Sequence, residues 1–259
     1  MDQLQLQSLP TTPGVYLFKD AKDKILYVGK AKNLKSRVSS YFSNKTLDSK
    51  TLILVNQIAS LSFIQVSSEI EAFLLESTLI KKHKPFYNIK LIDDKTYPYI
   101  EITTGNNPSL TVTRKKLDKK SHYFGPYSDA TALKIVLKLI RKIFPYQSVK
   151  THPKRKCLYY HLNLCPCISA VPENSNAYKK NLKKIEYFLN GKKEKVLKMF
   201  LAEQRRFVKG EKFEEAQTTQ DKINRINLIT SRSFEPFRYI EKPDFYFERI
   251  KNEIDSLKE

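Results

Sequence analysis

The sequence predicts an α/β protein of the α+β kind, in which a small antiparallel sheet flanked by helices precedes a mainly helical region. Three observations predict this class. Two short β-branched and aromatic runs, at 15–18 and 25–28, enclose the charged stretch KDAKDK, as in a β-hairpin. Helical spacing follows from residue 30. Residues 175–229 are almost continuously helical in pattern, with Gly191 and Gly210 as punctuation.

The composition bounds the class of protein. The chain has 259 residues, of which 41% are apolar and 12% aromatic, so it can bury a core as one large domain or two to three small ones. No apolar run reaches the ~18–20 residues of a membrane helix. The start, MDQLQLQSLP, lacks the basic and apolar regions of a secretory signal. We therefore expect a cytoplasmic protein.

The net charge of +20 is unevenly distributed. Residues 1–100 carry +5, residues 101–200 carry +15, and residues 201–259 are neutral. Such a field favours a polyanionic partner such as nucleic acid or an anionic membrane surface. A lysine-rich composition without function is the alternative, because Lys outnumbers Arg by 37 to 10. The neutral C-terminal part indicates a role other than holding DNA.

The predicted hairpin carries two phenols. If its loop is centred between Ala21 and Lys22, Tyr16 lies directly opposite Tyr27, and both side chains share one face of the sheet. The segment after Gly29 has helical spacing, with one stripe formed by Lys30, Asn33, Leu34, Arg37 and Tyr41. The hairpin and this helix can therefore present phenols and cations to a common cleft.

A second helix is predicted to begin near residue 68. Ser68 and Glu71 have capping-box spacing, and Pro85 closes the segment. Within it, Glu76 lies in the apolar run AFLLESTLI. A lone carboxylate there is either a functional group or a surface residue bordering the core.

Further along, YFGPY at 123–127 predicts a turn, and residues 131–144 predict an amphipathic helix. Three clustered cysteines follow at Cys157, Cys165 and Cys167. An odd number without a secretory signal indicates a metal or cluster site, or the remnant of one, rather than disulfides.

Several of these strings resemble one family. GVY at 14–16 and YVG at 27–29 contain Gly14 and Gly29; with Lys30, Asn33, Arg37, Glu76 and Asn88 they resemble the GIY-YIG nucleases. LYVGKAKNLKSRVSSYF, EIEAFLLESTLIKKHKPFYNIKLIDDKTYPYI and YFGPY resemble more closely the N-terminal half of the UvrC family, from about Leu9 to about Ile229. This implies a GIY-YIG nuclease domain over 1–100, a basic connecting region over 101–174, a helical UVR-like region over 175–230 and a tail of unknown role over 231–259.

The resemblance also implies roles in hydrolysing a DNA phosphodiester. Glu76 would hold one divalent cation, Mg²⁺ or Mn²⁺, through its carboxylate. Arg37 would grip the scissile phosphate, and Tyr16 or Tyr27 would be the general base, with a pKa lowered by Lys30 and the cation. Tyr41 and Asn88 would orient the water and hold the active-site loops.

The cysteines depart from the family pattern. UvrC proteins usually carry four, which can ligate an iron–sulfur cluster, whereas this chain has three, two of them in the pair CPC. His152 or His161 could replace the fourth ligand. Without a replacement the usual cluster does not close, and buried or inert thiols are expected.

Residues 211–223 resemble the UVR motif through which UvrC meets UvrB. The pattern is kept at Phe213, Glu214, Glu215, Ala216, Asp221 and Ile223. Gln217, Thr219 and Gln220 depart from it, which predicts weak affinity for UvrB. A helical pair that only caps the fold is the alternative.

The expected function is that of a DNA-repair excinuclease subunit. It would cut on the 3′ side of a lesion in damaged double-stranded DNA, in complex with UvrB and with UvrA acting upstream. Full UvrC proteins continue into an RNase H-like half, so this sequence is expected to be a short homologue, a fragment or a decayed gene product. The alternatives are a stand-alone structure-specific nuclease and a catalytically silent module that binds DNA or UvrB.

Overall fold

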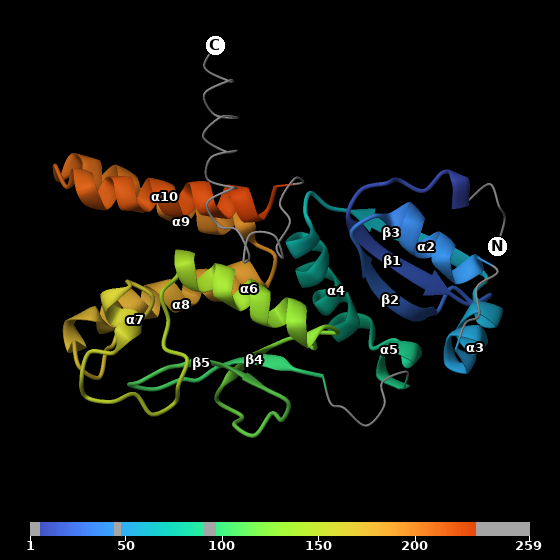
Figure 1. The fold of residues 1–259 in the computed structure, drawn as a ribbon, viewed down its shortest axis with the longest axis horizontal. Helices are drawn as coiled ribbons and strands as arrows, with labels where there is room; N and C mark the ends of the chain where they lie inside the picture. Colours follow the sequence, from blue (N-terminus) through green and yellow to red (C-terminus); the bar gives the residue numbers. More distant parts are fainter. Residues whose placement is uncertain (1–5, 44–47, 91–96, 232–259) are drawn as a thin grey trace, which may run out of the picture.

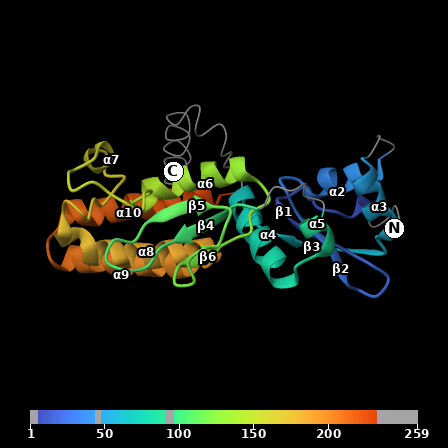
Figure 2. The same ribbon diagram turned by 90° about the horizontal axis from the view of Figure 1, so that it is seen from below.

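A computed structural model describes residues 6–43, 48–90 and 97–231. Two layered units lie along an elongated molecule, with a first sheet at the N-terminal end and a second sheet covered by long helices at the other (Figures 1 and 2). No helix in the described ranges is long and apolar enough to cross a membrane. The predicted tail at 231–259 lies, apart from its first residue, outside the described residues.

The first unit is built on an antiparallel sheet of strand order β2-β1-β3. Its strands are β1 (Gly14–Lys19), β2 (Ile25–Ala31) and β3 (Ser60–Gln65). One face packs on α2 (Leu34–Phe42) and α3 (Ser49–Gln57), and the other packs on α4 (Glu69–His83). The short helix α5 (Phe86–Lys90) lies along β2. β2 is therefore an edge strand whose outer side faces α4 and α5.

The hairpin register differs from the prediction. Tyr16 lies opposite Gly29, and Phe18 lies opposite Tyr27. The two phenols share one face, as predicted, but they are diagonal neighbours rather than a directly opposed pair. The predicted register was therefore wrong by two residues.

The turn explains this shift. The Asp20 carboxylate accepts hydrogen bonds of 2.9 Å from the backbone N–H groups of both Lys22 and Lys24. Asp23 adopts a positive φ of 60°, a conformation that Asp tolerates better than most residues. The loop therefore centres on Lys22, and an irregularity in the pairing beside Phe18 adds the rest of the shift.

The helix after the hairpin also begins later than predicted. β2 continues through Lys30 to Ala31, and Asn33 caps α2 by accepting a hydrogen bond of 2.9 Å from Ser36 N–H. Lys30 is thus a strand residue and Asn33 a cap, so they do not share the helical stripe of Arg37 and Tyr41. Residues 30 and 31 adopt the strand rather than the helical conformation because they pair with β1.

The second helix agrees with its predicted signals. Ser68 caps α4 by accepting from Glu71 N–H at 3.1 Å, while the Glu71 carboxylate accepts from Ser67 N–H at 2.9 Å. The helix ends where Lys84 adopts a left-handed conformation, directly before Pro85.

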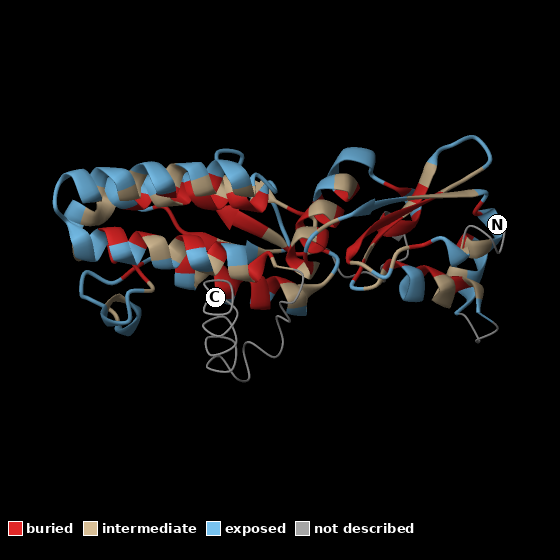
Figure 3. Cartoon of the chain, turned by 90° about the horizontal axis from the view of Figure 1, so that it is seen from above, coloured by how far each residue is buried: buried red, intermediate tan, exposed pale blue. Residues whose placement is uncertain are grey.

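The second unit contains a sheet of strand order β5-β4-β6. Its strands are β4 (Tyr99–Ile102), β5 (Leu110–Thr113) and β6 (His122–Phe124). Its helices are α6 (Ala130–Ile143), α7 (Leu158–His161), η1 (Pro172–Asn174), α8 (Ser175–Leu189), α9 (Lys193–Lys209) and α10 (Phe213–Ile229). The sheet, α6 and the three long helices share one core. Their buried residues face inward and their outer faces are exposed (Figure 3).

Helix α4 belongs to both units. Ala72 and Ile80 pack against the first sheet, whereas Ile70, Phe73 and Leu74 join the core of the second unit. Phe73 stacks on Tyr127 with ring centroids 4.9 Å apart. Glu76 therefore lies on a helix that is held from both sides.

Candidate active site

Three phenols and a guanidinium gather on the α2 face of the first sheet. The hydroxyls of Tyr16 and Tyr41 are 2.8 Å apart, and the Tyr27 ring centroid lies 6.1 Å from that of Tyr16 and 6.5 Å from that of Tyr41. Arg37, one turn before Tyr41 on α2, donates to its hydroxyl at 3.3 Å and remains exposed. The structure thus brings together the predicted residues of β1, β2 and α2.

Both motif glycines are required by close packing. A Cβ at Gly29 would lie 2.4 Å from the Tyr16 hydroxyl oxygen, and one at Gly14 would lie 2.5 Å from the Ile64 carbonyl oxygen. No real side chain tolerates such contacts. Gly29 therefore gives Tyr16 its space beside β2, and Gly14 lets β1 pass close to β3.

The outer edge of β2 is covered by two side chains. The Asn88 amide accepts from Val28 N–H at 2.7 Å and donates to Val28 C=O at 2.8 Å, as a neighbouring strand would. Two residues further along, the Glu76 carboxylate accepts from Lys30 N–H at 3.1 Å. Backbone groups at a strand edge need such partners when buried. Asn88 thus supports the edge of β2, and its part in orienting a water stays a prediction.

Glu76 is buried, with only 3% of its surface exposed. Its other carboxylate oxygen accepts from the Ser128 hydroxyl at 2.7 Å. Burial raises the pKa of Glu76, and this outweighs the stabilisation of the carboxylate by Ser128 and Lys30. The Lys30 ammonium itself lies 3.5 Å from Asp129. Glu76 is thus a buried carboxylate contacted by uncharged donors, and carboxylate oxygens are the ligands that hard divalent cations prefer.

Ser128 and Asp129 were not among the predicted site residues. They lie directly before α6, where the Asp129 carboxylate caps the helix by accepting from the N–H groups of Thr131 and Ala132. The sequence SDATA carries that capping signal. It carries no signal for the contact with Glu76, which depends on how the second unit packs on α4.

The pKa values of Tyr16 and Tyr27 are raised rather than lowered. Burial is the main cause for both Tyr16 and Tyr27, neighbouring phenols add to it, and Arg37 opposes it. The field of Glu76 also raises the pKa of Tyr27. The Lys30 ammonium lies 3.5 Å from Asp129, and the lowering of a phenol pKa by Lys30 together with the cation stays a prediction.

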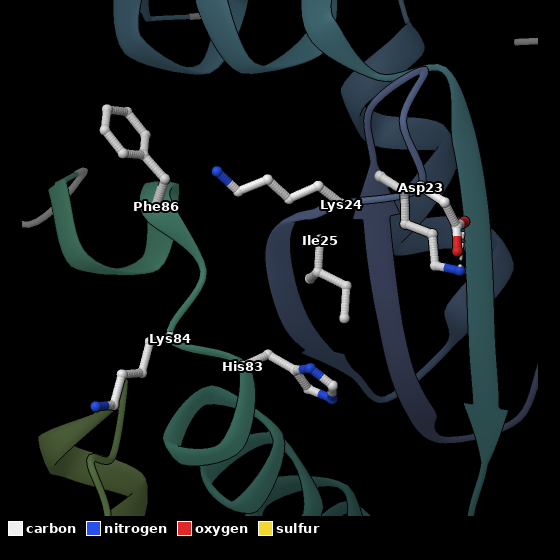
Figure 4. Close-up of a pocket in the computed structure, with 7 residues that line it drawn as sticks. Asp23, Lys24, Ile25, His83, Lys84 and Phe86 are labelled. Carbon is white, nitrogen blue, oxygen red and sulfur yellow. Dashed lines mark hydrogen bonds and ion pairs between the residues drawn. The ribbon is translucent and has the colours of Figure 1, made fainter.

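A hollow of about 710 Å³ lies away from the phenols, at the turn end of the hairpin (Figure 4). It is lined by Lys19, Asp23, Lys24, Ile25, His83, Lys84 and Phe86. Lys19 is paired with Asp23 at 2.8 Å, whereas Lys24 and Lys84 are exposed and extend from opposite sides, as Figure 4 shows. The hollow is a basic surface rather than the centre of the chemistry.

The cysteines of the second unit lie with one histidine. The ligand atoms of His152, Cys157, Cys165 and Cys167 all lie within 4.8 Å of one another. Burial opposes ionisation of Cys157, but hydrogen bonds involving Cys167 and His152 outweigh it and lower the pKa of this thiol to about 7. His161, the other predicted replacement, is exposed and lies outside this group.

The UVR-like residues divide between two faces of α10. Ala216 and Ile223 are buried, as is the departing residue Thr219. Phe213, which is 66% exposed, lies on the outside, together with Glu214, Glu215 and Asp221. The buried residues hold α10 within the chain, so only the exposed set is available to a partner.

Two family models match the chain in succession. The UvrC-like GIY-YIG domain matches residues 12–89, and the UvrC/Cho excinuclease middle domain matches residues 97–188. The two matches meet in the segment between α5 and β4, where the first unit gives way to the second.

Similar proteins carry the same description. UvrABC system protein C of Ligilactobacillus salivarius is 40% identical over 230 residues, which are 88% of this chain and 38% of that protein. The protein of the same description from Desulfitobacterium hafniense is 44% identical over 227 residues, which are 87% of this chain and 37% of that protein. The chain thus spans less than two fifths of the length of these curated relatives.

Solved structures of the GIY-YIG N-terminal endonuclease domain of UvrC from Thermotoga maritima also match. The match to the form bound to magnesium is 39% identical and covers 34% of this chain and 98% of that domain, with a TM-score of 0.31. The match to a point mutant bound to the catalytic divalent cation is 38% identical and covers 35% of this chain and 100% of that domain, with a TM-score of 0.32. The two successive family models, together with the curated relatives that are 40% and 44% identical, show that the chain belongs to the UvrC family of nucleotide excision repair subunits and carries the family's GIY-YIG and middle domains.

Proposed function

We propose that this chain is a metal-dependent endodeoxyribonuclease that hydrolyses a phosphodiester on the 3′ side of a DNA lesion. The observation that carries this proposal is the cluster of Arg37 with three phenols beside the buried Glu76, which contacts the edge of β2 and whose field reaches Tyr27. A guanidinium can bind the phosphate, a phenol can act as general base and a carboxylate can hold a metal ion, so together these groups could catalyse phosphodiester hydrolysis.

Each side chain has a task that its position supports. Glu76 would hold one Mg²⁺ or Mn²⁺ ion, which supplies Lewis-acid stabilisation of charge on the phosphate and on the leaving 3′ oxygen. Arg37, exposed on α2, would grip the scissile phosphate through its planar fork. Tyr41 would hold both Tyr16 and Arg37 in place through its hydroxyl.

Tyr27 is the better candidate for the general base. Tyr16 has no exposed surface, and its hydroxyl is engaged with that of Tyr41. Tyr27 also interacts with the Tyr41 hydroxyl, but it is half-buried rather than fully buried and lies within the field of Glu76, the proposed cation ligand. Its raised pKa must fall in the working state, and Arg37 acts in that direction.

The proposed partners are damaged double-stranded DNA, UvrB and, upstream, UvrA. The net charge of +20 and the basic hollow beside Lys24 and Lys84 support contact with DNA. The exposed apolar residues Leu201, Val208 and Phe213, on α9 and at the start of α10, support contact of this hairpin with UvrB. The buried Thr219 fills a position where the UVR pattern has an apolar residue, which supports weak binding.

The test is incision of a duplex with one bulky adduct, labelled at either end, with Mg²⁺ or Mn²⁺, in the presence and absence of UvrA and UvrB. Wild type is compared with Glu76→Gln, Arg37→Ala and Tyr27→Phe. Glu69→Gln is the matched control, because Glu69 lies on the same helix and only pairs with Lys32 at 3.5 Å.

We expect one cut 3′ of the adduct that needs UvrB and is lost in the three site variants but kept in the control. Removing one such group reduces rates by about 10²–10³-fold. Cutting without UvrB would replace this proposal with a stand-alone nuclease. Equal weak cutting by wild type and Glu76→Gln would contradict the catalytic role, and binding without cutting would leave a silent module.

A further inference from the structure

The second unit contains a buried group of three sulfurs and one imidazole nitrogen. Cys167 Sγ lies at its centre, 3.2 Å from Cys157 Sγ, 3.7 Å from Cys165 Sγ and 3.4 Å from His152 Nε2. Cys165 Sγ lies 3.6 Å from the same nitrogen. The four atoms thus form a compact cluster rather than a row of separate thiols.

We propose that these four side chains bind one Zn²⁺ ion as a structural Cys₃His site, in place of an iron–sulfur cluster. Zn–S bonds of ~2.3 Å and Zn–N bonds of ~2.0–2.1 Å in a tetrahedron give ligand separations of roughly 3.5–3.8 Å. The observed separations of 3.4–3.7 Å between Cys167, Cys165 and His152 lie close to this range. The Cys157 sulfur, at 3.2 Å, needs only a small outward movement.

An iron–sulfur cluster does not fit this arrangement. In a four-iron cluster each cysteine binds a different iron atom, so its sulfur ligands stand on the outside of a cage and far apart. Here the sulfurs are in contact, and Cys165 and Cys167 are separated by a single residue. The space between them suits one ion.

The histidine is held in the orientation that a zinc ligand needs. Its Nδ1 lies 3.0 Å from the Pro153 carbonyl oxygen, which accepts the Nδ1 proton. This bond leaves Nε2 deprotonated and directed at the sulfurs of Cys165 and Cys167. Such outer hydrogen bonds fix the tautomer and the ring of metal-binding histidines. His152 is also buried, with 8% of its surface exposed.

The surroundings compensate the charge of the site. Three thiolates and one Zn²⁺ carry one net negative charge, and the exposed residues Lys154, Arg155 and Lys156 directly precede Cys157. The Cys157 backbone N–H also points at Cys167 Sγ over 3.5 Å. Cations and N–H donors of this kind stabilise thiolates.

The metal would stabilise the segment between α6 and η1, which has little regular secondary structure of its own. Between α6 and η1 the chain forms only the four-residue helix α7. Cys165 and Cys167 are buried beside the core residue Ile168, whose N–H donates to Gln147 Oε1 at 3.1 Å. In Figure 1 this segment lies at the opposite end of the molecule from β1 and α2. The site is therefore separate from the proposed nuclease centre and structural in role.

The test measures metal content and binding in the full chain. The protein is produced in medium supplemented with zinc and iron and purified under reducing conditions, and its zinc, iron and acid-labile sulfide are quantified. The purified apoprotein is then titrated with Zn²⁺ and with Co²⁺, whose absorption reports tetrahedral thiolate ligation. The variants are Cys167→Ser, Cys157→Ser, His152→Ala and His152→Cys, with His161→Ala as the matched control.

We expect one zinc per chain in wild type and in His161→Ala, and tetrahedral Co²⁺ absorption in both. His152→Ala should bind at least tenfold more weakly, and His152→Cys should restore binding. Should the buried Cys167→Ser variant fail to fold, Cys157→Ser at the half-buried position must lose zinc instead. Chelation should lower the Tm of wild type but leave that of Cys157→Ser unchanged.

Three results would overturn the proposal. The first is iron with acid-labile sulfide at the site. The second is a Cys157–Cys167 disulfide in the native protein, which would require the sulfurs to close from 3.2 Å to about 2.05 Å. The third is apoprotein whose three thiols react freely and whose spectrum does not change on addition of Co²⁺.

Discussion

Glu101 in the second sheet and Glu76 beside the first are both buried carboxylates, but their surroundings shift their pKa values in opposite directions. Glu101 on β4, 2% exposed, is contacted by the Lys150 ammonium at 2.9 Å and the Tyr123 hydroxyl at 3.0 Å, and its pKa is lowered although burial alone would raise it. Glu76 on α4, 3% exposed, is contacted by a backbone N–H and a hydroxyl, and burial raises its pKa.

This difference separates a carboxylate that is paired with a cation of its own chain from one that is not. Glu101 has a cation supplied by its own chain, so its charge is compensated within the fold. The Lys30 ammonium acts on Glu76 only through its field, because it pairs with Asp129 at 3.5 Å. A buried charge without a counterion is unfavourable until a ligand supplies one. At equal burial, the Glu101 carboxylate therefore stabilises its unit, whereas the surroundings of Glu76 support its proposed role in binding a metal ion.

The largest effect should come from Glu101→Gln. This change removes the charge-assisted hydrogen bonds to Lys150 and Tyr123 and should lower the free energy of unfolding at pH 7 by about 2 kcal/mol. Denaturant melts of both proteins measure it. Glu173→Gln, an exposed change that also removes one negative charge from the same unit, is the control, and an equal loss in both would show that only net charge matters.

Glu76→Gln should have the opposite sign. The amide can still accept from Lys30 N–H and meet the Ser128 hydroxyl, while the unfavourable buried charge disappears. We expect the free energy of unfolding at pH 7, without added divalent cation, to rise by about 1 kcal/mol, or about 2–4 °C in Tm. A lower Tm than wild type would mean that the carboxylate is satisfied by its present contacts.

The pH dependence should separate the two carboxylates further. The folded state holds the Glu76 proton to higher pH than the unfolded state, so its destabilising effect is absent below 4.5 and complete above the raised pKa. The lowered pKa of Glu101 contributes stability that is present above 4.5 and lost as the pH falls through that lowered pKa.

At pH 5 the stability gain of Glu76→Gln should therefore have shrunk, whereas the loss in Glu101→Gln should persist. Melts of the three proteins between pH 4 and pH 8 measure this. Parallel curves for wild type and Glu76→Gln would show that the pKa of this carboxyl is not raised.

A smaller effect should follow from Ser128→Ala. The Ser128 hydroxyl stabilises the Glu76 carboxylate, so its removal should raise the pKa of Glu76 further. The acid limb of the pH–rate profile for incision should then move to higher pH, with the rate at high pH nearly unchanged. Ser40→Ala, on the exposed side of α2 facing its own helix carbonyl, is the matched control.

The smallest effect should come from Asp23→Asn. This carboxylate is paired with Lys19 at 2.8 Å, but it is 77% exposed. Exposed pairs contribute only about 0.2–1 kcal/mol, and Asn tolerates the positive φ of 60° as well as Asp does. Chemical denaturation should show a change below about 0.5 kcal/mol. A larger loss would mean that pairing matters more than burial in this protein.

The predictable parts of the fold were those with local signals. The caps of α4, the amphipathic α6 and the shared face of Tyr16 and Tyr27 all follow from spacing within a few residues. The hairpin register did not follow, because it depends on the left-handed turn at Asp23. The strands of the second sheet are three to four residues long, too short for a periodic signal to locate β5 and β6.

The candidate site divides in the same way. Glu76 is recognisable as an isolated carboxylate in an apolar run, and the resemblance identified its companions. The contacts of Ser128 and Asp129 with Glu76 and Lys30 join residues about 50 to 100 positions apart and have no local signature. The choice of His152 over His161 likewise depends on a loop that brings sequence-distant sulfurs to one imidazole.

The covered edge of β2 has a consequence for aggregation. An uncovered edge strand can template pairing with another chain, and natural sheets block that pairing. Here the blocking groups are the side chains of Asn88 and Glu76, which occupy the outward N–H and C=O groups of Val28 and the N–H of Lys30. Residues of the proposed site thus also block one edge of this sheet, and replacing Asn88 would leave the outward N–H and C=O groups of Val28 open to pairing with another chain.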